Sequence, residues 1–289
     1  MTRQSIEAAL ANALRQAVTR LPTDVLSALE RARAEETSPL AVGQLDILLE
    51  NVDIARRAGV PLCQDTGLLL FYVDAGARSP WLGALRSCIE SAVAQATTDV
   101  PLRPNTVDPL TGVSAVDNLG RGMPWIRWNL VDGDDVVVSI LPKGGGSDAA
   151  SRLVMLPCDT GPVEIVRAVI DHVAACEGKA CPPMVIGLGI GGPAEGALFL
   201  ATRALLRGLG SRHADPDVAE LEDEILDLAN RTGVGPAGLG GATTCLDVHA
   251  EVACRHPACF PLGIVISCWA ERRAKVVVHA DGSAEVVAP

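Results

Sequence analysis

Five consecutive residues, Cys63 to Gly67, place a thiol, an amide, a carboxylate and a hydroxyl side by side. An apolar run, 68–73, follows this CQDTG stretch, so the polar residues are expected on a turn at the start of a buried strand. Side chains of these types can ligate a metal, transfer a proton or bind a polar substrate. The alternative is structural: Asp65 and Thr66 cap the turn, and Cys63 is a small buried residue.

Two glycine-rich stretches could bring backbone N–H groups to a ligand. In KGGGS, 143–147, the lysine precedes the glycines, so this is not a nucleotide-binding P-loop. Gly144, Gly145 and Gly146 are either a flexible turn or backbone donors to a carboxylate. GLGIGG, 187–192, fits a dinucleotide-binding pattern, but the acidic residues further on begin a helix instead of ending a strand. We interpret its glycines as allowing close packing of a strand on a helix.

The chain contains nine cysteines, an odd number without an export signal, so a disulfide framework is not expected. Three of them, Cys63, Cys181 and Cys268, lie at expected turns or strand ends and are flanked by Pro, Gly or polar residues. Their flanking residues alone do not single them out as ligands. A cysteine pair with a histidine between, at 254–259, lacks the second ligand pair of a zinc site.

Several stretches resemble, in order, the α subunit or N-terminal half of class I fumarate hydratases and the related tartrate dehydratases, which are oxygen-sensitive iron–sulfur hydro-lyases. They are CQDTG at 63–67, LPKGGGS at 141–147, ACPP at 180–183, GSRHADP at 210–216, GPAGLGG at 235–241 and SCWAERR at 267–273. The resemblance covers essentially the whole chain and implies one iron–sulfur hydro-lyase α-type domain over 1–289.

This resemblance implies a [4Fe–4S] cluster held by the thiolates of Cys63, Cys181 and Cys268, with one iron left open. An open iron is a Lewis acid that can hold a substrate hydroxyl and a neighbouring carboxylate. A metal-ligating role for all three cysteines is therefore expected from the family.

The resemblance also implies that a small dicarboxylate substrate contacts the CQDTG turn, the loop containing Arg103 and the triple glycine at 144–146. Asp65 is expected to be the catalytic acid/base group, and Gln64 to orient the substrate, so both are catalytic and substrate-binding candidates. Arg103 is expected to clamp a substrate carboxylate, a bidentate task that lysine performs poorly. The three glycines would offer backbone donors to the same anion.

The implied reaction is the reversible hydration of fumarate to (S)-malate, a step of the tricarboxylic acid cycle, and the PKGGGS sequence favours this substrate. An L-tartrate dehydratase or mesaconate-type hydratase α subunit is the alternative. Single-chain relatives continue into a second domain, so we expect a β subunit, an α2β2 assembly and little activity of this chain alone. A non-catalytic iron–sulfur sensor and a nucleotide-binding protein are the competing interpretations from other classes.

The segment before the CQDTG turn is expected to be helical. Apolar residues on one helical face predict a helix over 5–21, a second after Thr23 and a third from Pro39, so about 1–60 is a helical portion. Further helices are expected at 82–96, 162–176, 194–206 and 216–229, and strands at 68–74, 124–130, 135–141, 184–189, 245–254, 262–268 and 274–279.

Turn and cap residues add detail to this order of elements. A DGD sequence, 132–134, predicts a hairpin between the strands on either side of it. Asp159 or Thr160 is expected to cap the helix at 162–176, and Asp215 the helix at 216–229. The order indicates an α+β, or mixed α/β, fold in which a helical layer precedes mixed-direction sheets with flanking helices.

Composition excludes several classes of partner. The chain is 48% hydrophobic, which suffices for a sizeable core, and its net charge is −11 without any basic run, so nucleic acid is not expected to bind. The N-terminus lacks a signal-peptide core, and the apolar stretch 257–270 is too short to span a bilayer. We expect a soluble, cytoplasmic protein with no membrane contact.

Overall fold

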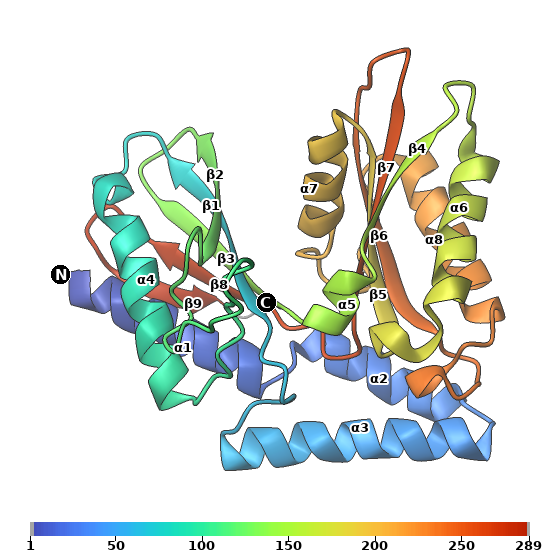
Figure 1. Cartoon of the computed structure of the whole chain (residues 1–289), viewed down its shortest axis with the longest axis horizontal. Helices are drawn as coiled ribbons and strands as arrows, with labels where there is room; N and C mark the ends of the chain where they lie inside the picture. Colours follow the sequence, from blue (N-terminus) through green and yellow to red (C-terminus); the bar gives the residue numbers. More distant parts are fainter. Residues whose placement is uncertain (1–2, 288–289) are drawn as a thin grey trace. The chain divides into compact units, whose positions relative to one another are not determined.

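The computed structural model of the chain describes residues 3–287 (Figure 1). The chain forms two compact units that are interleaved in sequence. Unit 1 contains the described residues up to Pro22, then Asn51–Gly144, and the residues from Arg272 on; unit 2 contains Thr23–Glu50 and Gly145–Glu271. The long helix α3 (Pro39–Ala58) contributes residues to both.

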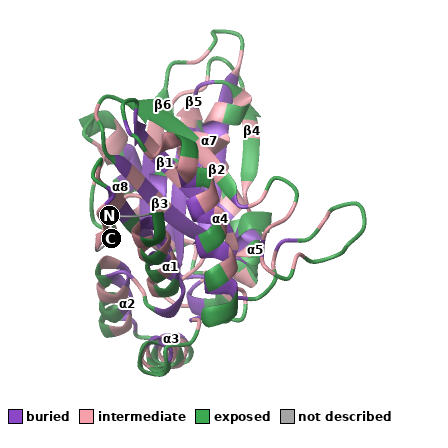
Figure 2. Cartoon of the chain, turned by 90° about the vertical axis from the view of Figure 1, so that its left-hand side faces the viewer, coloured by how far each residue is buried: buried purple, intermediate pink, exposed green. Residues whose placement is uncertain are grey.

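Unit 1 is a five-stranded mixed sheet with two helices packed on it. Its elements are α1 (Arg3–Thr19), β1 (Leu68–Gly76), α4 (Leu82–Asp99), β2 (Trp125–Val131), β3 (Val136–Lys143), β8 (Ala274–Val278) and β9 (Ala284–Val287). The strand order is β2-β1-β3-β8-β9. The apolar faces of α1 and α4, including Leu10, Leu14 and Ile89, join Phe71 and Ile140 of the sheet in one core (purple in Figure 2).

The predicted hairpin is wrong, although both of its strands exist. β2 pairs in parallel with β1, β3 pairs antiparallel with β1, and β1 therefore lies between them. The connecting segment wraps around the end of β1, where the N–H of Gly76 donates to the carbonyl oxygen of Asp135 (2.8 Å). A Cβ at Gly76 would lie 2.6 Å from that oxygen, so glycine is what allows the chain to pass so closely.

Unit 2 is a four-stranded mixed sheet between two layers of helices. Its elements are α2 (Thr23–Glu35), α5 (Gly145–Ala149), β4 (Arg152–Leu156), α6 (Pro162–Cys176), the 3-10 helix η1 (Glu177–Ala180), β5 (Met184–Gly191), α7 (Ala194–Ala204), α8 (Pro216–Arg231), the 3-10 helix η2 (Pro236–Gly238), β6 (Cys245–Ala253) and β7 (Phe260–Ser267), besides the first part of α3. The strand order is β4-β7-β5-β6. Helix α7 covers one face, and α6 and α8 cover the other (Figure 1).

The expected α+β fold with mixed-direction sheets is confirmed, and so are the three helices predicted within the first sixty residues. Strands β4 and β9 are additional; both are short and contain no buried residue, so they lack the alternation of buried and exposed positions that signals a strand. The cap prediction for α8 is right, because Asp215 accepts a hydrogen bond from the N–H of Asp217.

The cap prediction for α6 is wrong: Gly161 is the N-cap, and Glu164 accepts a hydrogen bond from its N–H (2.9 Å). A glycine supplies no side-chain acceptor, so the acidic residue in the first turn satisfies the backbone donor instead. Among the described residues, no helix combines the length and the apolar character that crossing a membrane requires.

Candidate functional site

The CQDTG stretch forms a turn directly before β1, as predicted. Asp65 Oδ1 accepts a hydrogen bond from the N–H of Gly67 (2.9 Å), which closes the turn. Gly67 has a φ of +86°, and a Cβ there would lie 2.7 Å from the backbone of Pro142, so only glycine fits. Cys63 and Gln64 are exposed and Asp65 is half-buried. The turn therefore presents the thiol and the amide to their surroundings.

The loop containing Arg103 is fastened to this turn. The backbone N–H of Arg103 donates to Thr66 Oγ1 (3.1 Å), and Asn105 Nδ2 donates to Asp65 Oδ1 (3.0 Å). The Arg103 side chain is exposed. The structure thus brings the backbone of Arg103 to the turn that carries Gln64 and Asp65.

A buried asparagine holds the Arg103 loop in place through hydrogen bonds to its backbone. Asn118 is 5% exposed; its Oδ1 accepts from the N–H of Asn105 (2.9 Å), and its Nδ2 donates to the carbonyl oxygen of Arg103 (3.2 Å). Asn105 and Asn118 hold this loop in place through their hydrogen bonds, and sequence reasoning misses both. The signal for Asn105 is weak, an amide in a proline-rich loop, and nothing in the sequence indicates that Asn118 reaches back to it.

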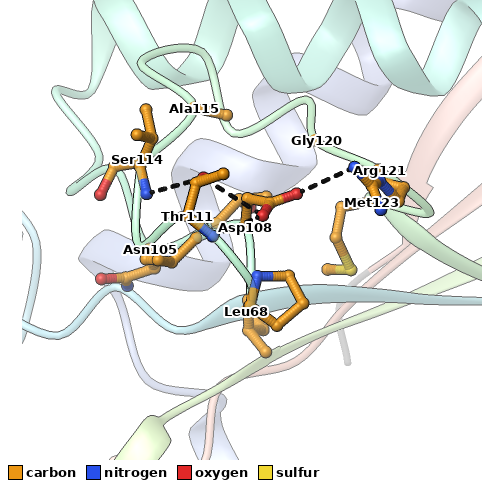
Figure 3. A pocket seen from close by; sticks show the side chains of 13 residues that line it. Leu68, Asn105, Asp108, Thr111, Ser114, Ala115, Gly120, Arg121 and Met123 are labelled. Atoms are coloured by element: carbon orange, nitrogen blue, oxygen red, sulfur yellow. Dashed lines mark hydrogen bonds and ion pairs between the residues drawn. The ribbon is translucent and has the colours of Figure 1, made fainter.

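A cavity of about 490 Å³ opens beside this loop in unit 1 (Figure 3). An ion pair between Arg121 and Asp108 (3.3 Å) lies in its wall. Backbone N–H groups of Thr111 and Leu110 hydrogen-bond the Asp108 carboxylate and lower its pKa. Asn105 lines the cavity and also binds Asp65, so the cavity adjoins the CQDTG turn.

Unit 2 brings two of the three predicted ligand cysteines together. Cys181 precedes β5 and Cys268 follows β7, and these strands are antiparallel neighbours with Val185 opposite Ser267. The N–H of Trp269 donates to the carbonyl oxygen of Cys181 (3.0 Å), which joins the two loops. Cys181 is exposed and Cys268 is half-buried. The backbone of Cys181 is left-handed, with φ 54°, so the chain turns sharply at this residue.

The triple glycine is not a flexible loop. Strand β3 continues through Lys143, Gly144 connects, and Gly145 and Gly146 begin the short helix α5. A Cβ at Gly146 would lie 3.4 Å from the carbonyl oxygen of Lys179, so α5 packs closely on η1, next to Cys181. Gly146 therefore lies at the same end of unit 2 as the cysteine pair.

The glycines of GLGIGG serve packing, as interpreted from the sequence. A Cβ on Gly187 would collide with the carbonyl oxygen of Ala201, and one on Gly189 with that of Ala197. Both oxygens belong to α7, so the two glycines let this helix lie directly on β5.

Two histidines whose rings could ligate a metal or transfer a proton, His213 and His249, occupy structural positions. His213 Nδ1 accepts from the N–H of Asp215 (3.0 Å) within the loop before α8. His249 on β6 is fully buried, 3.5 Å from Asp247, and burial lowers its pKa to about 4. At 254–259, the histidine ring accepts a backbone N–H from Ala258 and shapes a turn.

The predicted site residues are divided between the two units. Unit 1 holds Cys63, Gln64, Asp65, Arg103 and Gly144, and unit 2 holds Gly145, Gly146, Cys181 and Cys268. Within the described residues of either unit, no group of three or more His, Cys, Asp or Glu side chains could hold a metal ion.

Comparison of the sequence with known proteins identifies the family of this chain. Residues 7–277 match the family model described as fumarate hydratase (Fumerase). The chain belongs to the fumarate hydratase family. The putative L(+)-tartrate dehydratase subunit alpha of Methanocaldococcus jannaschii is 42% identical over 271 residues, which cover 92% of this chain and 95% of the relative. The L(+)-tartrate dehydratase subunit alpha of Escherichia coli O157:H7 is 38% identical over 264 residues, covering 91% and 87%.

The family expected from the sequence motifs is thus confirmed. Fumarate hydratases are hydro-lyases, so this member of the family is an enzyme of the hydro-lyase class. The match includes both the CQDTG turn in unit 1 and the cysteine pair in unit 2.

Proposed function

We propose that the chain is the α subunit of an iron–sulfur hydro-lyase that removes water from a small hydroxylated dicarboxylate. L(+)-tartrate is the first candidate substrate, because both relatives named above are α subunits of L(+)-tartrate dehydratases. Fumarate, hydrated to (S)-malate, is the second, favoured by the KGGGS sequence at 143–147 and by the family description. The proposal is carried by one arrangement: an exposed thiol and a hydrogen-bonded carboxylate on one turn, with an arginine on the loop that is hydrogen-bonded to that turn.

The donor chemistry of three cysteines fits a cluster. Cys63, Cys181 and Cys268 are exposed or half-buried and lie at turns, so iron can reach their sulfur atoms. By contrast, burial raises the pKa of the thiols of Cys88 and Cys245, which disfavours the thiolate. Other cysteines are also accessible, so the choice rests on the family resemblance: we assign Cys63, Cys181 and Cys268 as the ligands of a [4Fe–4S] cluster. When bound, its open iron supplies a Lewis acid that makes a substrate hydroxyl a better leaving group.

The chain's own residues bind and orient the substrate and move its proton. Asp65 is assigned as the base that takes the proton next to a substrate carboxylate, because Gly67 and Asn105 fix its orientation. Gln64 is exposed beside it and is assigned to orient the substrate through its amide. Arg103 presents a planar guanidinium for a substrate carboxylate.

Backbone donors add to this anion-binding set. Gly144, Gly145 and Gly146 have no side chains, so a carboxylate can approach the backbone closely here, and we assign this segment as a source of N–H donors to the same anion that Arg103 clamps. The N–H donors lie in the segment where β3 ends and α5 begins. We assign the remaining acid/base and cationic residues of the site to a β subunit, which pairs with this chain in an α2β2 assembly.

The test is anaerobic reconstitution of the chain with its β partner, with iron and sulfide, followed by assays on L(+)-tartrate, (S)-malate, fumarate and mesaconate. We expect the highest kcat/KM with L(+)-tartrate, a mass corresponding to α2β2, and weak or no activity of the α chain alone. A higher kcat/KM with malate or fumarate would select the second candidate. A fully loaded complex that converts none of the four would overturn the proposal.

A further inference from the structure

Arg272 is a buried cation in the segment between β7 and β8. Its side chain is 2% exposed and is among the largest fully buried side chains of the chain. It follows Cys268 by four residues and lies two residues before the first residue of β8, Ala274. An arginine is rarely buried to this degree unless an anion pairs with it.

The contacts of Arg272 do not supply that anion. Its Nη1 donates to the carbonyl oxygen of Asp65 (2.8 Å), and its Nε has no hydrogen-bond partner. No carboxylate of the part of the chain that the structure describes is bonded to this guanidinium. Arg207 shows the usual arrangement: its Nη1 lies 2.6 Å from Glu222 Oε1, a fully buried carboxylate. Burial of an unpaired guanidinium opposes folding, because its hydration is lost without an ionic partner in return.

The hydrogen bond from Arg272 to the Asp65 carbonyl indicates which anion could compensate this guanidinium. The Asp65 carbonyl belongs to the CQDTG turn, two residues after Cys63. Cysteines ligate iron as thiolates, so a bound cluster brings negative charge to this turn, and a buried cation held at the turn can compensate that charge. Arg272 is thus hydrogen-bonded to the turn of one proposed ligand and is four residues along the chain from another, Cys268.

We propose that Arg272 is a positioning residue for the cluster: it holds the Cys63 turn through the Asp65 carbonyl and compensates the negative charge of the thiolate-ligated cluster. This inference rests on the proposed function, because it requires the cluster. It also explains why a guanidinium is used, since its planar fork can keep the carbonyl bond and still direct other N–H groups elsewhere.

The role has opposite consequences for the two forms of the protein. In the cluster-free form, Arg272→Met removes an uncompensated buried charge and keeps most of the side-chain volume, so the unfolding temperature stays the same or rises. In the loaded form, the same change removes the counter-charge and one anchor of the turn, so the cluster is lost faster. A purely structural arginine would lower the unfolding temperature of both forms.

The experiment uses the complete complex with the β partner, cluster-free and after anaerobic reconstitution. Wild type, Arg272→Met, Arg272→Lys and the control Arg207→Met are compared by iron and sulfide content, by the rate of cluster loss to a chelator, and by unfolding temperature. We expect Arg272→Met to lose its cluster on the order of 10-fold faster than wild type. Arg272→Lys should fall between the two. Arg207→Met should lower both unfolding temperatures and leave the rate of cluster loss unchanged.

Two results would count against the inference, and they are distinguishable. If Arg272→Met loses its cluster at the wild-type rate while its cluster-free form unfolds at lower temperature, as in the control, Arg272 is structural and only this inference is overturned. If the wild-type complex takes up no cluster at all, the proposed function fails, and the inference fails with it.

Discussion

Asp65 is oriented by residues far from it in the chain. Its carboxylate accepts hydrogen bonds from Gly67 and from Asn105, and its carbonyl accepts one from Arg272. Only the first of these contacts is local, so most of what fixes this residue comes from tertiary packing within unit 1. A proton acceptor needs such fixed geometry, because misplacement by even an ångström slows proton transfer.

Replacing Asp65 with Asn tests its role as a base. Asparagine keeps an oxygen that can accept from the Gly67 N–H, so the turn should persist while the basic group is lost. We expect turnover of the reconstituted complex to fall by about 10²- to 10⁴-fold. Cluster absorbance and unfolding temperature should stay at wild-type values. The measurement is a steady-state assay beside an absorbance spectrum of the same sample.

A matched control is available at Asp281. Its carboxylate also accepts from a backbone N–H two residues on, that of Ser283 (2.8 Å), but in the turn between β8 and β9. Asp281→Asn should therefore leave turnover almost unchanged. Near-normal turnover of Asp65→Asn would remove Asp65 from the chemistry.

At the scale of elements, the sequence predicts where strands and helices lie better than how they pair. Local apolar patterns locate β5 and β7 and place Cys181 and Cys268 at their ends. That these cysteines become neighbours follows from the antiparallel pairing of the two strands, which is a contact between distant segments. The hairpin prediction fails for the same reason: the DGD turn is a local signal, and the insertion of β1 between β2 and β3 is not.

The contact between β5 and α7 gives a prediction for GLGIGG. Gly189→Ala would force a Cβ against the carbonyl oxygen of Ala197, and the helix would have to move away from the strand. We expect a loss of about 1–3 kcal/mol in the free energy of unfolding, as in overpacked cores. The control is Gly43→Ala in α3, where a Cβ meets nothing within 4 Å. It should be neutral or stabilising by about 0.5–1 kcal/mol, and both are measured by urea unfolding.

If Gly189→Ala is as stable as wild type but binds NAD or ATP less well, the nucleotide-binding interpretation would replace the packing one. The packing interpretation requires the reverse: a lower free energy of unfolding and no nucleotide binding by either protein.

A buried histidine on β6, His249, makes the free energy of unfolding depend on pH. Burial lowers the pKa of His249 from 6.5 to about 4. The charged groups around it are Asp247, Arg207, Glu222 and Arg212. Below about pH 6.5 the unfolded chain binds a proton at this histidine and the folded chain does not. The stability that the neutral ring contributes is therefore fully present above pH 6.5 and is lost as pH falls toward 4.

We expect His249 to account for a fall of about 2 kcal/mol in the free energy of unfolding between pH 7 and pH 5. Urea unfolding of wild type and His249→Leu at both pH values isolates this contribution, because other titrating groups are common to both. His279→Gln is the control; that exposed ring hydrogen-bonds Asp135, which raises its pKa, so its contribution is lost as pH rises instead. An identical pH dependence in wild type and His249→Leu would contradict the assignment.

At the scale of the whole molecule, the chain passes between the two units several times, so some candidate site residues belong to one unit and some to the other. Motifs along the sequence identify the family and the residues that the family uses. They do not identify Asn118 or Arg272, whose roles arise only when segments far apart in the chain meet. The residues proposed to touch the substrate or the cluster can thus be named from the resemblance, whereas the residues that hold them in place are identified only by the structure.

The proposed cluster has three thiolate ligands, and the contribution of each can be tested by replacing one cysteine at a time. Cys63→Ser, Cys181→Ser and Cys268→Ser should each abolish stable cluster binding, because each removes one of three thiolate ligands. Iron and sulfide analysis after anaerobic reconstitution is the measurement. Cys254→Ser, which changes another exposed thiol of unit 2, should keep the wild-type iron content. A cluster that survives in Cys63→Ser and is lost in Cys254→Ser would mean that the ligands lie elsewhere.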